Sequence, residues 1–237
     1  MVQHGHSPQE VQRRISTPPG RGLLRDVVYG GIDGSVTTFA IVAGVAGAGL
    51  SPVIIVALGI ANVLADGFSM AAGNFLGTKA ELDDAKRLRV VEKHHLQEWP
   101  EGERLEIREI LRLKGLEGDV LEAATDAIAA NEEAAVQLML EGEYGLASVD
   151  PHPQRAALAT FLAFLVAGMV PLLPFIFGMP DAFRLSAYLT GVTFFAIGTM
   201  KSKWSLEPWW RSGLETLAIG GVAAGIAYGV GSLFNVG

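Results

Sequence analysis

An aspartate stands in the middle of an apolar stretch near the start of the chain. Asp33 lies within "VVYGGIDGSVTTFAIVAG", residues 27–44, where most of the neighbours are aliphatic residues or glycines. An ionisable side chain at the depth of a lipid bilayer costs about 2.5–3.5 kcal/mol on insertion scales, so packing alone rarely explains it. Such residues mark ion paths and proton relays, and Asp33 is a candidate for either role.

A second apolar stretch carries four side chains at intervals of four residues, which places them on one face of a helix. They are Asn62, Asp66, Met70 and Asn74. Carboxylate and amide oxygens together with a thioether suit a divalent first-row metal, and the sulfur favours Fe²⁺ over Mg²⁺ or Ca²⁺. Two simpler interpretations stay open, because Met70 could only pack and Asp66 could only hydrogen-bond a neighbouring helix.

The short turn "GAGLSP" joins the two stretches and predicts an antiparallel helical hairpin. Asp33 can then face the polar stripe of the second helix. Asp26 lies seven residues before Asp33, about two helical turns away on the same face. We therefore predict an ion path that involves Asp26, Asp33, Asn62, Asp66 and Met70.

A third group of candidate ligands lies in an acidic segment between residues 79 and 155. Its members form pairs spaced three or four residues apart, which share a helix face. The pairs are Glu92 with His95, Glu103 with Glu106, and Met139 with Glu143. Helical bundles build carboxylate–histidine metal sites from such pairs. A solvated acidic surface is the alternative, because glutamate is abundant throughout this segment.

The composition places these side chains in an integral membrane protein. Of the 237 residues, 50% are hydrophobic and 18% are charged, and the mean hydropathy is +0.34. Several stretches reach the roughly 20 apolar residues that a helix needs to cross the hydrocarbon core. We predict five membrane-spanning helices, at about residues 27–50, 52–77, 156–178, 183–200 and 213–234.

The segment 79–155 is predicted to be a helical insertion between the second and third spans. Its first part lacks glycine and proline, so the second helix should continue out of the bilayer, and Pro100 can begin the next helix. Gly115 and Gly118 then interrupt the chain, and one or two further helices follow. The predicted fold is all-α. Its parts are a flexible cytoplasmic tail at 1–26, a transmembrane hairpin at 27–78, a cytoplasmic helical metal-binding domain at 79–155, and three spans within 156–237.

The negative net charge arises in the insertion. It holds 18 of the 25 acidic residues but 10 of the 18 Lys and Arg residues, which accounts for the net charge of −7. Nucleic-acid binding is excluded, because phosphate contacts need a basic surface. The distribution of Lys and Arg predicts that the N-terminus and the insertion are cytoplasmic. The short N-terminal tail, with no signal-peptide pattern, favours a prokaryotic plasma membrane over a vacuolar membrane.

Residue types also limit the possible chemistry. The chain has no cysteine, which excludes disulfides, thiolate metal sites and cysteine nucleophiles. None of the five histidines, at positions 4, 6, 94, 95 and 152, lies in a predicted span. Serine–histidine hydrolysis in the bilayer therefore lacks its base. An intramembrane enzyme is the weakest interpretation, and we expect no enzymatic activity.

Small residues predict close helix packing in two places. Gly221, Gly225 and Gly229 recur every four residues along one face of the last span, a pattern that lets helices approach closely. Gly31 and Gly34 flank Asp33 and leave room for a second helix there.

Several motifs together resemble the vacuolar iron transporter family. They are "RDVVYGGIDGSVTTFAIVAG", "ADGFSMAAGNFLGTKAE", the acidic insertion, "MVPLLPF" and "SGLETLAIGG", in order from about residue 24 to the C-terminus. The resemblance implies a five-span homodimer that exchanges cytosolic Fe²⁺, and often Mn²⁺, for protons. It also implies an ion path between the first helices of the two subunits and a cytoplasmic domain that gathers metal through Glu and Met side chains.

The resemblance assigns roles to individual residues. It implies that Asp33 is the intramembrane carboxylate, that Met70 is the methionine ligand, and that Asp26 stands at the cytoplasmic entrance of the path. The positions that match the metal-binding residues of the insertion are Glu92, Glu103, Glu106, Met139 and Glu143.

Three positions depart from the family pattern. Asn62 stands where a glutamate is expected, with Asp66 one turn later as a possible substitute. His95 replaces a fourth glutamate, which removes one negative charge but keeps a ligand suited to Fe²⁺ or Mn²⁺. Leu140 replaces one of two adjacent methionines and makes the site less soft, so iron is favoured over manganese only modestly.

Two functions from different classes follow. The first is a proton-coupled transporter that moves Fe²⁺ or Mn²⁺, with Co²⁺ or Zn²⁺ as further candidate ions, out of the cytosol as a homodimer in the lipid bilayer. The second is a membrane-anchored metal buffer or sensor without transport. The polar stripe within the second span favours the transporter, because a buffer needs no ligands in the bilayer.

Overall fold

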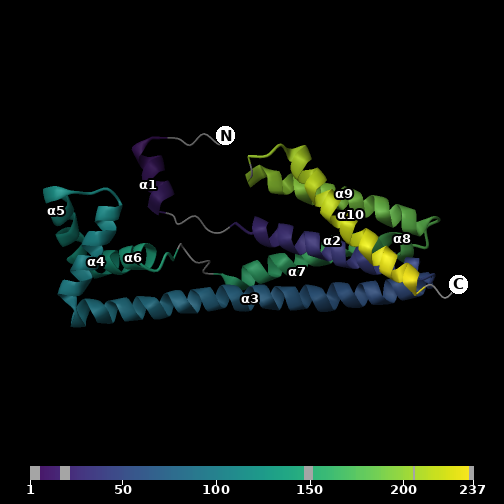
Figure 1. The fold of residues 1–237 in the computed structure, drawn as a ribbon, viewed down its shortest axis with the longest axis horizontal. Coiled ribbons are helices and arrows are strands. Elements are labelled where there is room, and N and C mark those ends of the chain that lie inside the picture. The colour runs from purple at the N-terminus through teal and green to yellow at the C-terminus, as the bar shows by residue number, and fades with distance from the viewer. Residues whose placement is uncertain (1–5, 17–21, 147–151, 205, 235–237) are drawn as a thin grey trace. The chain divides into compact units, whose positions relative to one another are not determined.

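The computed structural model describes residues 6–16, 22–146, 152–204 and 206–234, and within these ranges every regular element is a helix. This confirms the all-α prediction. Figure 1 shows the elements in order along the chain. They are α1 (Pro8–Ser16), α2 (Leu24–Gly47), α3 (Pro52–Glu98), α4 (Pro100–Leu113), α5 (Gly118–Ala129), α6 (Glu132–Gly142), α7 (Pro153–Met169), η1 (Val170–Leu172), α8 (Leu173–Ile176), α9 (Ala182–Lys201), η2 (Ser202–Trp204) and α10 (Trp209–Leu233).

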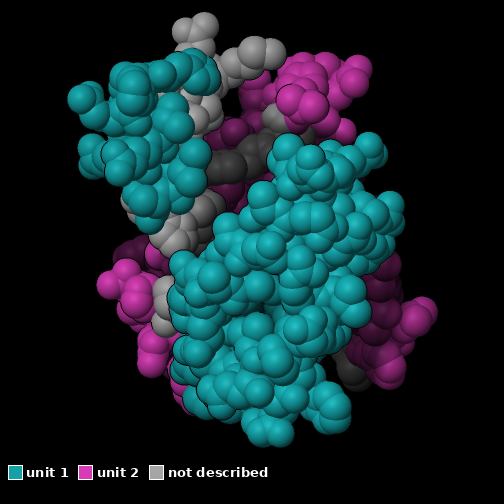
Figure 2. All heavy atoms as spheres, turned by 90° about the vertical axis from the view of Figure 1, so that its left-hand side faces the viewer, with its two compact units in different colours: residues 1–21, 77–151 teal, residues 22–76, 152–237 magenta. Residues whose placement is uncertain are grey.

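The chain divides into two compact units, which Figure 2 colours separately. One unit comprises residues 1–21 and 77–151, and the other comprises residues 22–76 and 152–237. Helix α3 contributes to both, because its 47 residues run without a break from the apolar stretch into the acidic segment. The absence of glycine and proline from the first part of the insertion had predicted this continuity.

Four helical stretches are long and apolar enough to cross a membrane. They are Leu24–Gly47, Pro52–Glu98, Pro153–Ile176 and Trp209–Leu233. The fourth predicted span corresponds to α9, which has 20 residues but is not among them. Arg184, Lys201 and several hydroxyl side chains dilute its apolar character. The chain is therefore a multi-pass membrane protein, and the count of five spans stays a prediction.

Helix α2 is the centre of the apolar unit, where it packs against α7, α9 and α10. Its glycines permit this. A methyl group added to Gly34 would lie 2.4 Å from the carbonyl oxygen of Phe164, and one added to Gly30 would lie 2.4 Å from that of Thr160. Both partners lie on α7. The room predicted beside Asp33 is therefore taken up by another helix of the same chain.

The glycine stripe of α10 does not pack against the described residues of this chain. A methyl group added to Gly221, Gly225 or Gly229 would meet nothing within 4 Å in this chain. The close contact of α10 with α2 runs instead through Gly231, where an added methyl group would lie 2.1 Å from the carbonyl oxygen of Gly44. The four-residue spacing identified a face of small residues, but not the face that packs within the chain.

A cluster of apolar side chains joins the hairpin to the rest of this unit. It contains Phe39, Val42, Val45, Ile55, Val63 and Leu172. These residues come from α2, α3 and η1, and a hydrogen bond from Asn62 Nδ2 to Thr37 Oγ1 (3.3 Å) also links α2 to α3. Asn74 reaches Asp26 in the same pair of helices, so the partners run in opposite directions, as an antiparallel hairpin requires.

The acidic unit is a small helical assembly with its own core. Ile107, Ile110, Leu111, Leu121, Ala135 and Met139 form its largest buried cluster. Pro100 opens α4 as predicted. Gly115, after the end of α4, and Gly118, the first residue of α5, adopt positive φ angles of 92° and 59°. Two helices, α5 and α6, complete the insertion.

Helix α1 lies within the segment that the sequence predicted to be a flexible tail. Its start is a reciprocal capping box. The backbone N–H of Glu10 donates to Ser7 Oγ (3.3 Å), and the backbone N–H of Ser7 donates to the Glu10 carboxylate (3.2 Å). Ser7, Pro8 and Glu10 are the sequence signal for this helix start.

The close approach of α2 and α7 can be tested by adding one methyl group. Gly34→Ala should lower the melting temperature of the purified protein, because overpacking of this kind typically costs about 1–3 kcal/mol. Gly73→Ala is the matched control, since a methyl group there meets nothing within 4 Å, and alanine is the better helix former. Equal melting temperatures for the two variants would contradict the packing described here.

Candidate metal site and ion path

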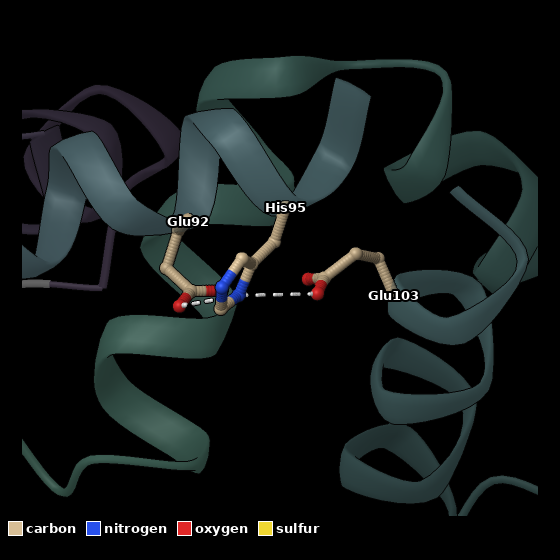
Figure 3. A group of neighbouring side chains, drawn as sticks. All are labelled: Glu92, His95 and Glu103. Atoms are coloured by element: carbon tan, nitrogen blue, oxygen red, sulfur yellow. Dashed lines mark ion pairs between the residues drawn. The ribbon is translucent and has the colours of Figure 1, made fainter. Parts of the chain in front are cut away.

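Three side chains of the acidic unit converge from two helices (Figure 3). Glu92 and His95 lie one turn apart on α3, and Glu103 lies on α4. His95 Nδ1 is 3.7 Å from Glu92 Oε1 and 3.6 Å from Glu103 Oε1, and one ligand atom from each residue lies within 4.8 Å of the others. The structure thus brings together three of the six residues that the sequence proposed as ligands in the insertion.

Both carboxylates of this cluster are buried. Glu92 is 0% exposed and Glu103 is 4% exposed, and Oε2 of each has no hydrogen-bond partner among the described residues. A buried ionised oxygen without a partner is costly, and such carboxylates are usually paired or bound to a metal. Carboxylate and imidazole ligands suit Fe²⁺ and Mn²⁺. The cluster therefore fits a divalent cation.

Protonation is the other way to satisfy these oxygens. Burial raises the pKa of Glu103 from its ordinary 4.5 to about 7, and repulsion from Glu106 and Glu92 adds to the effect. A cation and a proton therefore compete for Glu103 near neutral pH.

Two further carboxylates lie near the cluster without joining it. Glu106 and Glu143 are exposed. The pKa of Glu143 is raised by partial desolvation and then by the charges of Glu106 and Glu92, which shows that these carboxylates are close enough to repel one another. Their charges increase the attraction of the region for cations.

The remaining predicted ligand, Met139, is fully buried in the apolar core of this unit. Leu140, at the position where the family has a methionine, packs with Leu88 and Val136 in a second buried cluster. The four-residue spacing of Met139 and Glu143 could not show whether Met139 is a ligand or a core residue. Ligands and core residues both recur on one face of a helix, so they show the same spacing.

The sequence did not identify Tyr144 as part of the site. Its hydroxyl group donates a hydrogen bond to Glu92 Oε1 (2.8 Å), the oxygen that faces His95. A neighbour that donates to a ligating carboxylate fixes its orientation. Tyr144 follows the predicted ligand Glu143 directly, but 52 residues separate it from Glu92, so only the fold reveals the contact.

In the apolar unit, Asp33 lines a cavity of about 830 Å³. The other lining residues belong mainly to α2, with Lys201 of α9 and Ile219 of α10. Asp66 of α3 is close enough for its carboxylate to repel that of Asp33. The carboxylates of Asp33 and Asp66 are thus near one another, on the two helices of the hairpin.

Amides of α3 organise the polar side chains that face it. Asn74 Nδ2 donates to Asp26 Oδ1 (2.9 Å) and to Thr160 Oγ1 (2.7 Å), which ties α2, α3 and α7 together. Asn62 donates to Thr37 Oγ1, and Thr37 in turn donates to the backbone oxygen of Asp33. Met70 is half-buried on the same face of α3. The polar stripe therefore faces other helices of the chain along part of its length.

Comparison with known proteins identifies the family. The sequence profile of the VIT family matches residues 24–232, which is most of the chain. The chain belongs to the VIT family. Vacuolar iron transporter 1 of Oryza sativa subsp. japonica is 32% identical over 88% of this chain and 84% of its own length. Vacuolar iron transporter 1 of Arabidopsis thaliana is 33% identical (87% and 84%), and the vacuolar iron transporter of Toxoplasma gondii is 34% identical (90% and 74%).

Membership of the VIT family confirms the resemblance and makes the protein an ion transporter of the membrane. The relatives are named iron transporters, and the cluster of Glu92, His95 and Glu103 has ligands that suit a divalent cation such as Fe²⁺. The VIT family match covers residues of both units, including those of the metal cluster and of the candidate ion path.

The raised pKa of Glu103 predicts how stability depends on pH. Between its ordinary value of 4.5 and about 7, the metal-free folded protein binds more protons than the unfolded chain, so the stability contributed by this group falls as pH rises. Glu103→Gln removes this dependence. Its melting temperature relative to wild type should rise by about 2 °C or more between about pH 5 and pH 8 in chelator. A constant difference would contradict the raised pKa.

The hydrogen bond from Tyr144 to Glu92 predicts a role in metal binding. Tyr144→Phe should weaken Mn²⁺ binding to the full-length protein by about tenfold, the lower end of the range for residues that orient a ligand. Isothermal titration calorimetry in detergent measures this directly. Tyr188→Phe is the matched control, because Tyr188 is exposed on α9 in the other unit. Unchanged affinity in Tyr144→Phe would show that Glu92 needs no orientation.

Proposed function

We propose that the protein is a homodimeric antiporter that moves Fe²⁺ and Mn²⁺ out of the cytosol in exchange for protons. The observation that carries this proposal is the pair of buried carboxylates, Glu92 and Glu103, with unpartnered oxygens beside His95. It occurs in a member of a family whose relatives are named iron transporters.

Metal capture starts at the acidic unit. Glu92, His95 and Glu103 bind the ion, while Glu106 and Glu143 attract it to the site through their charge. His95 supplies a neutral nitrogen that suits Fe²⁺ and Mn²⁺ and also Co²⁺ or Zn²⁺. Met139 would add a soft ligand only if its side chain left the apolar core, so we expect the site to discriminate weakly between iron and manganese.

The ion then enters the membrane through the path on α2 and α3. Asp26, held by Asn74, stands at the entrance on the cytoplasmic side, and Asp33 and Asp66 lie deeper. Met70 provides a thioether and Asn62 an amide oxygen along the same face of α3. We place the path between the α2 helices of two subunits, where the cavity beside Asp33 would be completed by the partner.

Proton coupling follows from the proximity of Asp33 and Asp66. Two carboxylates close together in apolar surroundings repel one another unless a cation or a proton is present. A metal ion on its way out of the cytosol neutralises the two carboxylates. Protons that arrive from the non-cytoplasmic side then protonate the carboxylates and release the metal to that side. Asp66 then supplies the carboxylate that Asn62 lacks.

Flux into liposomes tests this function. Wild-type protein with a proton gradient should transport Fe²⁺ and Mn²⁺, and Asp33→Asn should lower the rate at least tenfold, because the amide can neither neutralise the ion nor carry a proton (about 1.4 kcal/mol per factor of ten). Asp119→Asn, at an acid in the first turn of α5, should transport as wild type does.

The same assay distinguishes transport from metal buffering. Full activity in Asp33→Asn would remove this residue from the path. Metal binding by wild-type protein without any flux, with or without a pH gradient, would instead identify a membrane-anchored buffer or sensor.

A further inference from the structure

A second groove lies on the apolar unit, next to the cavity beside Asp33, and the two share Val28 in their linings. It has a volume of about 620 Å³ and forms where α2, α7 and α9 meet. On α7 its lining includes Leu158, Leu162 and Val166, which follow one another at intervals of four residues and are 58%, 50% and 66% exposed. Such a continuous exposed apolar surface needs an apolar occupant in the bilayer or in an assembly.

Among the described residues that line the groove, one is charged, and it is a cation. Arg155 lies in the first turn of α7, and its side chain is exposed. Within the described part of the chain, no carboxylate forms an ion pair with it, whereas the nearby cation Lys201 is paired with Glu215 at 2.9 Å. The groove therefore combines an apolar channel with a guanidinium group at one end that pairs with no carboxylate of the described residues.

The length of the groove matches one leaflet of a bilayer. Along α7 and into the start of η1 its lining runs from Arg155 to Val170, and at about 1.5 Å per residue these fifteen steps span about 22 Å. Half of a hydrocarbon core of about 30 Å is about 15 Å, which leaves Arg155 at the level of the headgroups. The apolar stretch beyond it then lies at the depth of a single acyl chain.

Charge complementarity selects the occupant. An apolar helix of a second copy would cover Arg155 without neutralising it, and a metal cation would be repelled by it. An anionic phospholipid satisfies both parts, because its phosphate can accept bidentate hydrogen bonds from the guanidinium group while one acyl chain fills the apolar channel. Basic pockets between membrane helices are known to hold such headgroups.

We propose that this groove is a binding site for one anionic phospholipid, with the phosphate on Arg155 and an acyl chain along Leu158, Leu162 and Val166. The lipid would contact Val27, Val28 and Gly31 of α2. The same helix carries Asp33, which lines the neighbouring cavity. Its occupancy should therefore stabilise α2 in the bundle. This site is independent of the proposed transport function.

Native mass spectrometry of the detergent-purified protein tests the site. Wild type should retain added dioleoylphosphatidylglycerol at least fivefold more than dioleoylphosphatidylcholine, and Arg155→Gln should abolish this preference. Arg184→Gln, at an exposed arginine in the first turn of α9 that does not line the groove, should behave as wild type. Equal retention of both lipids by wild type, or an unchanged preference in Arg155→Gln, would overturn the proposal.

A second variant separates the groove from a simple surface charge. Ala163→Phe fills the groove but keeps Arg155, so it should lower phosphatidylglycerol retention and remove the rise in melting temperature that this lipid gives to wild type. Retention at the wild-type level in Ala163→Phe would show that the lipid does not enter the groove.

Cysteine cross-linking tests the competing occupant, a second copy of the chain. Since the natural sequence has no cysteine, Leu162→Cys is a single-cysteine protein. We expect it to stay uncross-linked under oxidising conditions in the membrane. Efficient disulfide-linked dimers would show that another copy covers the groove and would overturn the lipid site.

Discussion

A carboxylate that leaves water needs a proton, a cation or a hydrogen-bond donor, and both units of this protein are arranged around that requirement. In the acidic unit, Glu92 accepts a hydrogen bond from Tyr144 on one oxygen, and none of the described residues donates to the other. In the apolar unit, Asp26 is held by the amide of Asn74. The partially satisfied groups are the ones with capacity left for an ion.

Helix α3 contributes residues both to the polar contacts of the apolar unit and to the metal cluster of the acidic unit. It carries the amides that organise the polar side chains facing it in the apolar unit, and further along it carries Glu92 and His95. In the apolar unit, the neighbouring helices can come close only because glycines of α2 meet the backbone of α7. Small residues and polar residues therefore act together, since the first bring helices near and the second give the resulting contact its chemistry.

Much of this organisation could be predicted from local patterns. The uninterrupted α3, the start of α4 at Pro100 and the shared face of Glu92 and His95 depend on residues that are neighbours in sequence. The contact of Tyr144 with Glu92 could not be predicted, because it joins residues that only the tertiary fold brings together. Sequence spacing also suggested Met139 as a ligand, because spacing shows which residues share a helix face but not what that face contacts. In the fold, the Met139 side chain lies in the apolar core.

The unpartnered oxygens of Glu92 and Glu103 have a consequence for how long the protein survives in a cell. A ligand that binds only the folded form shifts the unfolding equilibrium by mass action, so ions that satisfy these oxygens would also protect the acidic unit from local opening. Proteases cleave chains from such opened states. Starvation for metal would then shorten the lifetime of the transporter itself, and supply would lengthen it, without any change in synthesis.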